Sequence, residues 1–104
     1  MKKHKEYLER SDLKNATHLE VSIYYTKGGA NYFSGGVTPR GFYLMVTPVT
    51  KDGVTISFTA FTGYSRLLFE TQRYTDKQFA RAIDMAEEHK EALIATVVEK
   101  NKAA

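Results

Sequence analysis

Aromatic rings and cations gather in one glycine-rich stretch of the sequence, where together they could bind a strand of nucleic acid. Residues 27 to 44, KGGANYFSGGVTPRGFYL, hold five of the seven glycines and place Lys27 and Arg40 among four aromatic residues. Rings of this kind stack on unpaired bases, while cations track the phosphates. The same stretch also fits a plain connection between two strands, because glycine pairs supply the positive φ angles that turns need.

Catalytic and cofactor chemistry is not indicated. No GK[ST] follows the glycines, and no G-x-G-x-x-G is present, so neither type of phosphate-binding loop is predicted. GYSRL, residues 63 to 67, is not a G-x-S-x-G nucleophile elbow. The histidines His4, His18 and His89 fall in separate elements, and neighbouring helical positions such as Glu88 and His89 point about 100° apart. We therefore predict no enzyme activity, no metal site and no cofactor.

Length and composition favour one small domain spanning residues 1 to 104. The chain is 42% hydrophobic, which is enough for a modest core, and it has no cysteine for a disulfide or a thiolate metal site. No apolar run approaches the roughly 18 to 20 residues that span a bilayer. The first residues, MKKHKEYLER, lack the apolar core of a signal peptide. We expect a cytoplasmic protein that does not enter membranes, and its net charge of +3 is compatible with a nucleic-acid partner.

The elements that must position these side chains begin with a sheet, predicted between residues 18 and 75. Apolar and polar residues alternate there with the period of half-buried strands. The predicted strands are LEVSIYY (19–25), FYLMVTPV (42–49), VTISFTAFT (54–62) and RLLFETQRY (66–74). Asp52 and Gly53 suit a tight turn between the second and third strands. The prediction is a four-stranded antiparallel β-meander.

Two helices complete the predicted α+β fold. Residues 76 to 101 form a long C-terminal helix, and Thr75 and Gln78 have the spacing of a capping box at its start. Residues 3 to 14, within an N-terminal arm of residues 1 to 17, look like a short polar helix. A 26-residue helix is roughly 39 Å long, whereas an eight-residue strand spans about 27 Å. The overhanging end should therefore be buried in a homodimer. The interface residues predicted are Leu93, Ile94, Val97 and Val98.

The order of four strands and a long helix is similar to that of the Whirly, Pur and transcriptional-coactivator group of single-strand binders. PRGFYLMVTPV (39–49) followed by DGVTISFTAF (52–61) looks like two successive strands of a Pur repeat. The resemblance covers residues 19 to 100 and implies a dimer that binds single-stranded DNA or RNA. By position it points to Arg40, Tyr43 and Phe61, although the Lys-Gly-Lys-Ala signature of Whirly proteins is absent. The GGxNYFxG…RGFYL core also resembles uncharacterised small proteins of bacterial mobile elements.

One helix can cover only one face of the sheet, and the open face should carry the binding residues. Rings would stack on bases there and cations at the margins would contact phosphates. The predicted binding residues are Tyr24, Lys27, Tyr32, Phe33, Arg40, Tyr43, Phe61, Arg66 and Arg73. Thr and Tyr are favoured on any exposed strand face. The alternative is therefore a protein-interaction module, such as a regulator or inhibitor encoded by a phage or mobile element.

Overall fold

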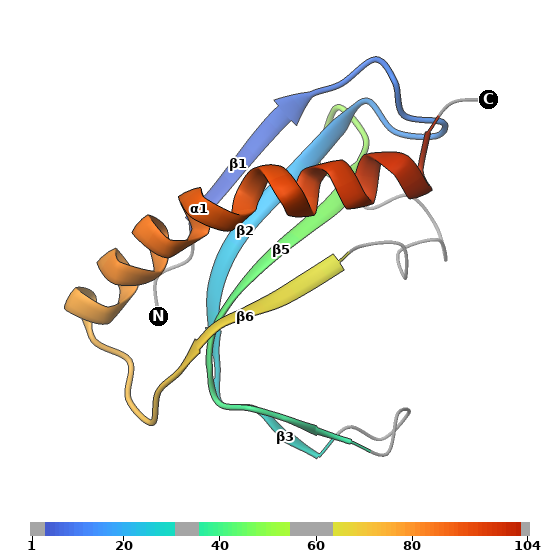
Figure 1. The fold of residues 1–104 in the computed structure, drawn as a ribbon. Helices are drawn as coiled ribbons and strands as arrows, with labels where there is room; N and C mark the ends of the chain where they lie inside the picture. The colour runs from blue at the N-terminus through green and yellow to red at the C-terminus, as the bar shows by residue number, and fades with distance from the viewer. Residues whose placement is uncertain (1–3, 31–35, 55–63, 103–104) are drawn as a thin grey trace.

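The computed structural model describes residues 4–30, 36–54 and 64–102, which form an antiparallel sheet with one long helix against one of its faces (Figure 1). The elements are β1 (His4–Glu9), β2 (His18–Thr26), β3 (Gly29–Ala30), β4 (Val37–Thr38), β5 (Gly41–Val49), β6 (Tyr64–Glu70) and α1 (Asp76–Lys100). The main sheet has the order β1-β2-β5-β6, and β3 pairs with β4 in a separate ribbon. The predicted α+β class, with four antiparallel strands and a long C-terminal helix, is confirmed.

The N-terminal arm forms a strand, so the helix predicted for residues 3 to 14 is wrong. β1 pairs with β2 along its whole length, with Glu6 opposite Val21. Its residues alternate between partly buried and exposed, and Leu8 packs against the core. A polar helix of this length is marginal in water, whereas pairing with β2 satisfies the backbone and buries one face. Tertiary pairing therefore outweighs local helix propensity.

The last strand of the sheet also differs from the predicted meander. β5 pairs directly with β6, and Val46 lies opposite Tyr64. The sequence predicted an intervening strand over residues 54 to 62, of which 55 to 62 lie outside the described residues. The turn before it is confirmed, because the Gly53 N–H donates to the Thr50 carbonyl at 2.9 Å and Gly53 has a φ of 79°.

The core lies between α1 and one face of the sheet. The strands contribute mainly Leu19, Val21, Ile23, Phe42, Leu44 and Val46, and α1 contributes Phe79, Ala82, Ala86, Ile94 and Val97. Phe42 is fully buried at the centre of an aromatic cluster. Its ring centroid is 5.2 to 6.1 Å from those of Tyr25, Phe69, Tyr74 and Phe79. This cluster fixes which face of β5 points toward α1.

The predicted cap at the start of α1 is present, with one change of partner. The Thr75 hydroxyl accepts a hydrogen bond from the Gln78 backbone N–H at 3.1 Å. The Gln78 side-chain amide donates to the Thr71 hydroxyl at 2.7 Å. The cap therefore also joins the helix to the segment that follows β6.

The C-terminal half of α1 is buried within the chain itself. Ile94 is 4% exposed and Val97 is fully buried, while Leu93 and Val98 are partly buried against the same core. These residues thus do not form a separate apolar cluster awaiting a second subunit. Burial within the chain therefore accounts for these side chains without a second subunit, and the homodimer stays a prediction.

The segment between β1 and β2 closes this end of the core. Leu13 is buried there and forms an isolated bridge with Lys102. The Lys14 N–H donates to the Asn101 carbonyl at 2.8 Å. This loop belongs to the predicted N-terminal arm, and it covers the end of α1 that was expected to contact a second subunit.

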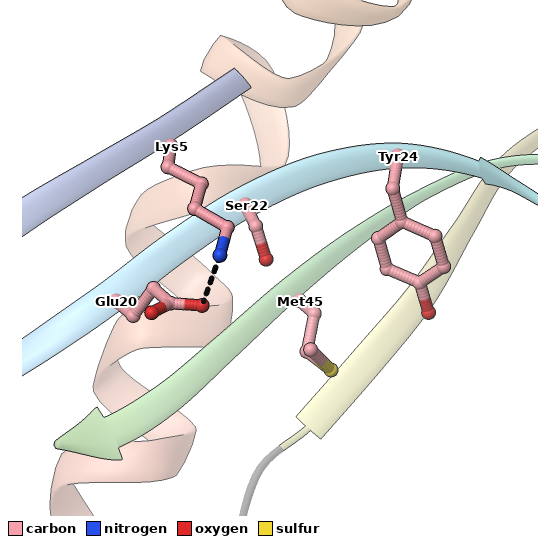
Figure 2. A pocket seen from close by; sticks show the side chains of 5 residues that line it. All are labelled: Lys5, Glu20, Ser22, Tyr24 and Met45. Carbon is pink, nitrogen blue, oxygen red and sulfur yellow. Dashed lines mark ion pairs between the residues drawn. The ribbon is translucent and has the colours of Figure 1, made fainter. Parts of the chain in front are cut away.

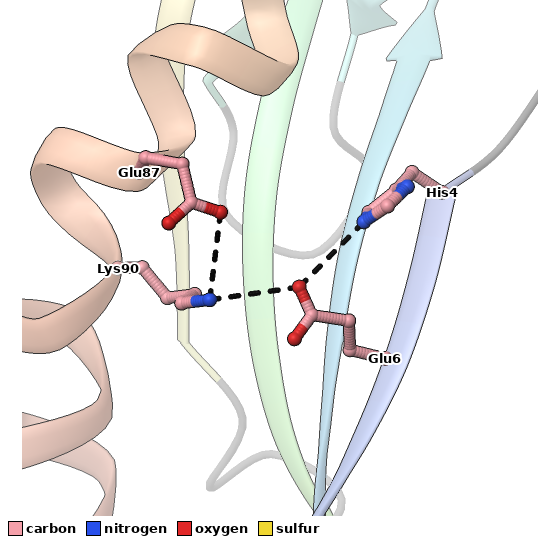
Figure 3. A network of polar contacts seen from close by, with 4 residues as sticks. All are labelled: His4, Glu6, Glu87 and Lys90. Atoms are coloured by element: carbon pink, nitrogen blue, oxygen red, sulfur yellow. Dashed lines mark hydrogen bonds and ion pairs between the residues drawn. The ribbon is translucent and has the colours of Figure 1, made fainter.

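A polar network attaches α1 to the edge strand β1 (Figure 3). Lys90 Nζ lies 3.5 Å from a carboxylate oxygen of both Glu6 and Glu87, and His4 Nε2 lies 3.6 Å from the same Glu6 oxygen. Burial lowers the pKa of Lys90, but the attraction of the two carboxylates outweighs burial and leaves the pKa raised. Lys90 is therefore held in its charged form against β1.

Candidate nucleic-acid interface

The middle of the face opposite α1 is built from three rows of cross-strand neighbours. Paired residues share a face, and residues two apart along a strand are about 6.6 Å apart. The rows are Tyr7–Glu20–Thr47, Lys5–Ser22–Met45–Ser65 and Tyr24–Tyr43–Leu67. Figure 2 shows part of this face with α1 behind the sheet. Within residues 4–30, 36–54 and 64–102, no helix covers it.

Two stacked tyrosines occupy the third row. The ring centroids of Tyr24 and Tyr43 are 5.7 Å apart, and their planes differ by 16°. Tyr43 is only 8% exposed, and its hydroxyl donates to the Pro39 carbonyl at 2.7 Å. Tyr24 and Tyr43 both lie on the predicted face, but Tyr43 exposes little surface on which a base could stack. Tyr24 is partly exposed, so it is the ring available to a ligand, with Tyr43 as its support.

Burial favours the neutral form of both phenols. It raises the pKa of Tyr24, with a further contribution from Tyr43. Burial likewise raises the pKa of Tyr43, with a smaller contribution from the nearby charge of Glu70. The pair therefore carries no negative charge at neutral pH, as is usual for tyrosine.

A hollow of about 420 Å³ lies beside this pair. Its lining residues are Tyr24, Gly36, Val37, Thr38, Pro39, Tyr43 and Ser65. One side is the β3–β4 ribbon, which Figure 1 shows extending away from the main sheet. The glycine-rich connection between two strands thus includes a ribbon, with Gly29 opposite Thr38. The predicted binding residues Tyr32 and Phe33 lie outside the described residues.

Three of the predicted cations belong to segments that come together at this end of the sheet. Arg40 Nε donates to the Lys27 carbonyl at 3.2 Å, and its Nη1 donates to the Gln72 carbonyl at 3.5 Å. Arg40 therefore ties together the segments that follow β2 and β6. Lys27, Arg40 and Arg73 are all exposed, and Arg73 is adjacent in sequence to Gln72. This end of the sheet therefore carries three exposed cations, and Arg40 directly follows Pro39, which lines the hollow.

Arg66 does not join this group. It lies opposite Leu44, whose side chain is in the core under α1. Because paired residues share a face, Arg66 projects from the helix side of β6, where it is exposed. Its predicted place near the open face is therefore corrected, and Phe61 lies outside the described residues.

A second, smaller hollow was missed by sequence reasoning (Figure 2). It has a volume of about 190 Å³ and is lined by Lys5, Glu20, Ser22, Tyr24 and Met45. Lys5 was overlooked because its segment was assigned to a helix. The alternation of His4, Glu6 and Leu8 with Lys5, Tyr7 and Glu9 is the signal that could have found it.

Comparisons with known proteins identify no relative of this chain. No protein-family model, curated protein or solved structure matches it. In the part of the chain that the structure describes, no cluster of three His, Asp or Glu residues could hold a metal ion. No helix in these ranges is long and apolar enough to cross a membrane.

Proposed function

We propose that this chain binds single-stranded nucleic acid on the face opposite α1. The observation that carries the proposal is that the exposed Lys27, Arg40 and Arg73 lie in segments joined by Arg40 at the end of the sheet that holds the hollow edged by Tyr24. Base stacking on a ring contributes about 1 to 3 kcal/mol and tolerates any sequence, while cations neutralise the backbone. The two requirements of a single-strand site therefore occur side by side.

Within this proposal the chain is a cytoplasmic accessory factor in transcription or replication, with no enzymatic step. The resemblance to Whirly and Pur proteins supports the same role, since those proteins bind single strands. A homodimer belongs to that role as well, and DNA and RNA are both retained as ligands. Because the hollow and the cations occupy one end of the sheet, one chain would hold only a few nucleotides.

A protein-interaction module is the second candidate, and exposed apolar side chains favour it. Tyr7 on this face is 50% exposed, and Val37 on the ribbon is 77% exposed. Apolar side chains on a polar face suit contact with another protein. The two candidates differ in their response to salt, because apolar contacts are not weakened by added ions.

The test is fluorescence anisotropy with labelled oligo-dT at about 50 and 200 mM salt. Three phosphate contacts on a single strand give a slope of about −2 in log affinity against log salt, or about a twentyfold loss over this range. Salt-independent affinity, or no binding at low salt, would reject the proposal in favour of the protein-interaction module.

Matched variants separate the two kinds of contact. Arg73→Ala should weaken every sequence and reduce the salt slope by about 0.7. Arg66→Ala removes the same charge on the helix side of the sheet and should leave affinity unchanged. Tyr24→Ala should cost about 1 to 3 kcal/mol per stacked base and keep the salt slope. Equal losses for the two arginines would contradict the assigned face.

A further inference from the structure

The smaller hollow contains a pair of opposite charges placed to read the edge of a base. Its walls are Lys5 and Glu20 on one side and Tyr24 and Met45 on the other, with Ser22 between them (Figure 2). Lys5 and Met45 both lie opposite Ser22 in the sheet, so adjacent strands fix their spacing. The position of the charged pair relative to Tyr24 is therefore set by the sheet.

The charged pair keeps hydrogen-bonding capacity for a ligand. Lys5 Nζ is 3.7 Å from Glu20 Oε1, longer than the 2.7 to 2.9 Å typical of a charge-assisted hydrogen bond. An ionised carboxylate offers about four acceptor sites and an ammonium three donors. The Glu20 side chain is 14% exposed, so the carboxylate is largely shielded from water but still borders the hollow. A ligand with donors facing Glu20 and an acceptor facing Lys5 would satisfy both groups.

We propose that this hollow selects guanine, an inference that rests on the proposed function. The Watson–Crick edge of guanine carries the N1–H and N2–H donors next to the O6 acceptor. The two donors match the Glu20 carboxylate, and O6 matches the Lys5 ammonium. Adenine and cytosine place a ring-nitrogen acceptor on this edge, and thymine or uracil flanks a single donor with two carbonyls. Each of these bases would bring an acceptor against the carboxylate.

Size and position also suit one base. A volume of about 190 Å³ is below the 300 to 1,000 Å³ of pockets for drug-sized ligands, so it suits a single base. Tyr24 lines this hollow and the larger one. A guanine here and any base in the larger hollow would therefore lie on either side of Tyr24. The larger hollow would supply sequence-tolerant stacking, and the smaller one would supply specificity.

The test compares labelled dT oligonucleotides that carry one central dG, dI, dA or dC. Inosine lacks only the N2 amino group, so comparing dG with dI isolates one donor to Glu20. We expect the dG strand to bind about tenfold more tightly than the dA and dC strands, with dI intermediate. This comparison uses the unmodified protein and therefore does not depend on whether a variant folds.

Glu20→Gln should remove the preference for dG over dI, whereas Glu9→Gln, an exposed carboxylate outside the hollow, should preserve it. Equal affinity for all four strands in the unmodified protein would overturn the guanine site and leave single-strand binding intact. Persistence of the dG preference in Glu20→Gln would also overturn it. Absence of binding to every strand would reject the proposed function and this inference together.

Discussion

Phe42 provides the most direct test of how the sheet and α1 pack. Its side chain is fully buried, and four other aromatic rings lie within 6.1 Å of its ring centroid. Phe42→Ala would leave a cavity where the ends of β2, β5 and β6 meet the first turns of α1. Phe42→Leu would keep much of the volume but lose the ring contacts.

The expected magnitudes follow from this environment. Truncation of a buried phenylalanine to alanine costs roughly 3 to 5 kcal/mol. Aromatic pairs add about 0.5 to 1.5 kcal/mol each beyond area burial, so Phe42→Ala should fall near the upper end. Phe42→Leu should cost about 1.5 kcal/mol. Because small domains are stable by only about 5 to 15 kcal/mol, the alanine variant loses about a third or more of its stability.

Urea denaturation followed by circular dichroism measures these losses. With a slope of about 1 to 3 kcal/mol per molar urea, Phe42→Leu should lower the midpoint by about 0.5 to 1.5 M. Tyr43→Phe is the control, since it lies on the opposite face and loses only the hydrogen bond to Pro39, worth about 0.5 to 1.5 kcal/mol. A loss for Phe42→Ala no larger than for Tyr43→Phe would refute the assignment of faces.

Three further predictions test other parts of the fold. Val97→Asp should lower the free energy of unfolding by about 3 to 5 kcal/mol, because it buries an unpaired charge in the chain's own core, and thermal melting measures this loss. A Val97→Asp variant that stays folded as a monomer would instead support the predicted dimer interface. Gly41→Ala should cost about 1 to 3 kcal/mol in urea denaturation, because its Cβ would collide with the Phe69 carbonyl; unchanged stability would contradict this register. The pKa values of Tyr24 and Tyr43 are raised in the folded protein, so the unfolded chain releases these protons first as the pH rises past the ordinary value of 10.0. The free energy of unfolding should therefore fall above that pH, and it should fall less steeply in Tyr43→Phe.

Sequence patterns predicted those elements whose structure depends on local periodicity. Alternation identified β2 and β5, and the Thr75 cap with the 3.6-residue period identified α1. β1 was missed because a short, highly charged segment has no decisive local preference. Its pairing with β2 is a long-range contact, which residues 4 to 9 do not encode by themselves.

The candidate site was predicted in part for the same reason. Tyr24 and Tyr43 follow from the phase of β2 and β5, which a turn-bounded alternation sets, whereas Lys27 and Arg40 lie just beyond the ends of these strands. Arg66 lies on the helix side, opposite Leu44, beyond a register shift between Phe42 and Tyr43 where β5 meets β6. Such an irregularity reverses the face on which each following residue of the strand lies, and no local sequence pattern predicts where it occurs. Lys5 was missed with the strand that carries it.

The bridge between Leu13 and Lys102 has a consequence for the order in which the chain folds. Contacts between residues distant in sequence form late, because closing a long loop costs entropy before any packing compensates it. The hairpin-like pairs of the sheet can form early, but this bridge must wait until the end of α1 is in place. Until then the apolar end of α1 around Val97 stays uncovered. A nascent or partly unfolded chain would therefore be most prone to aggregate through that end.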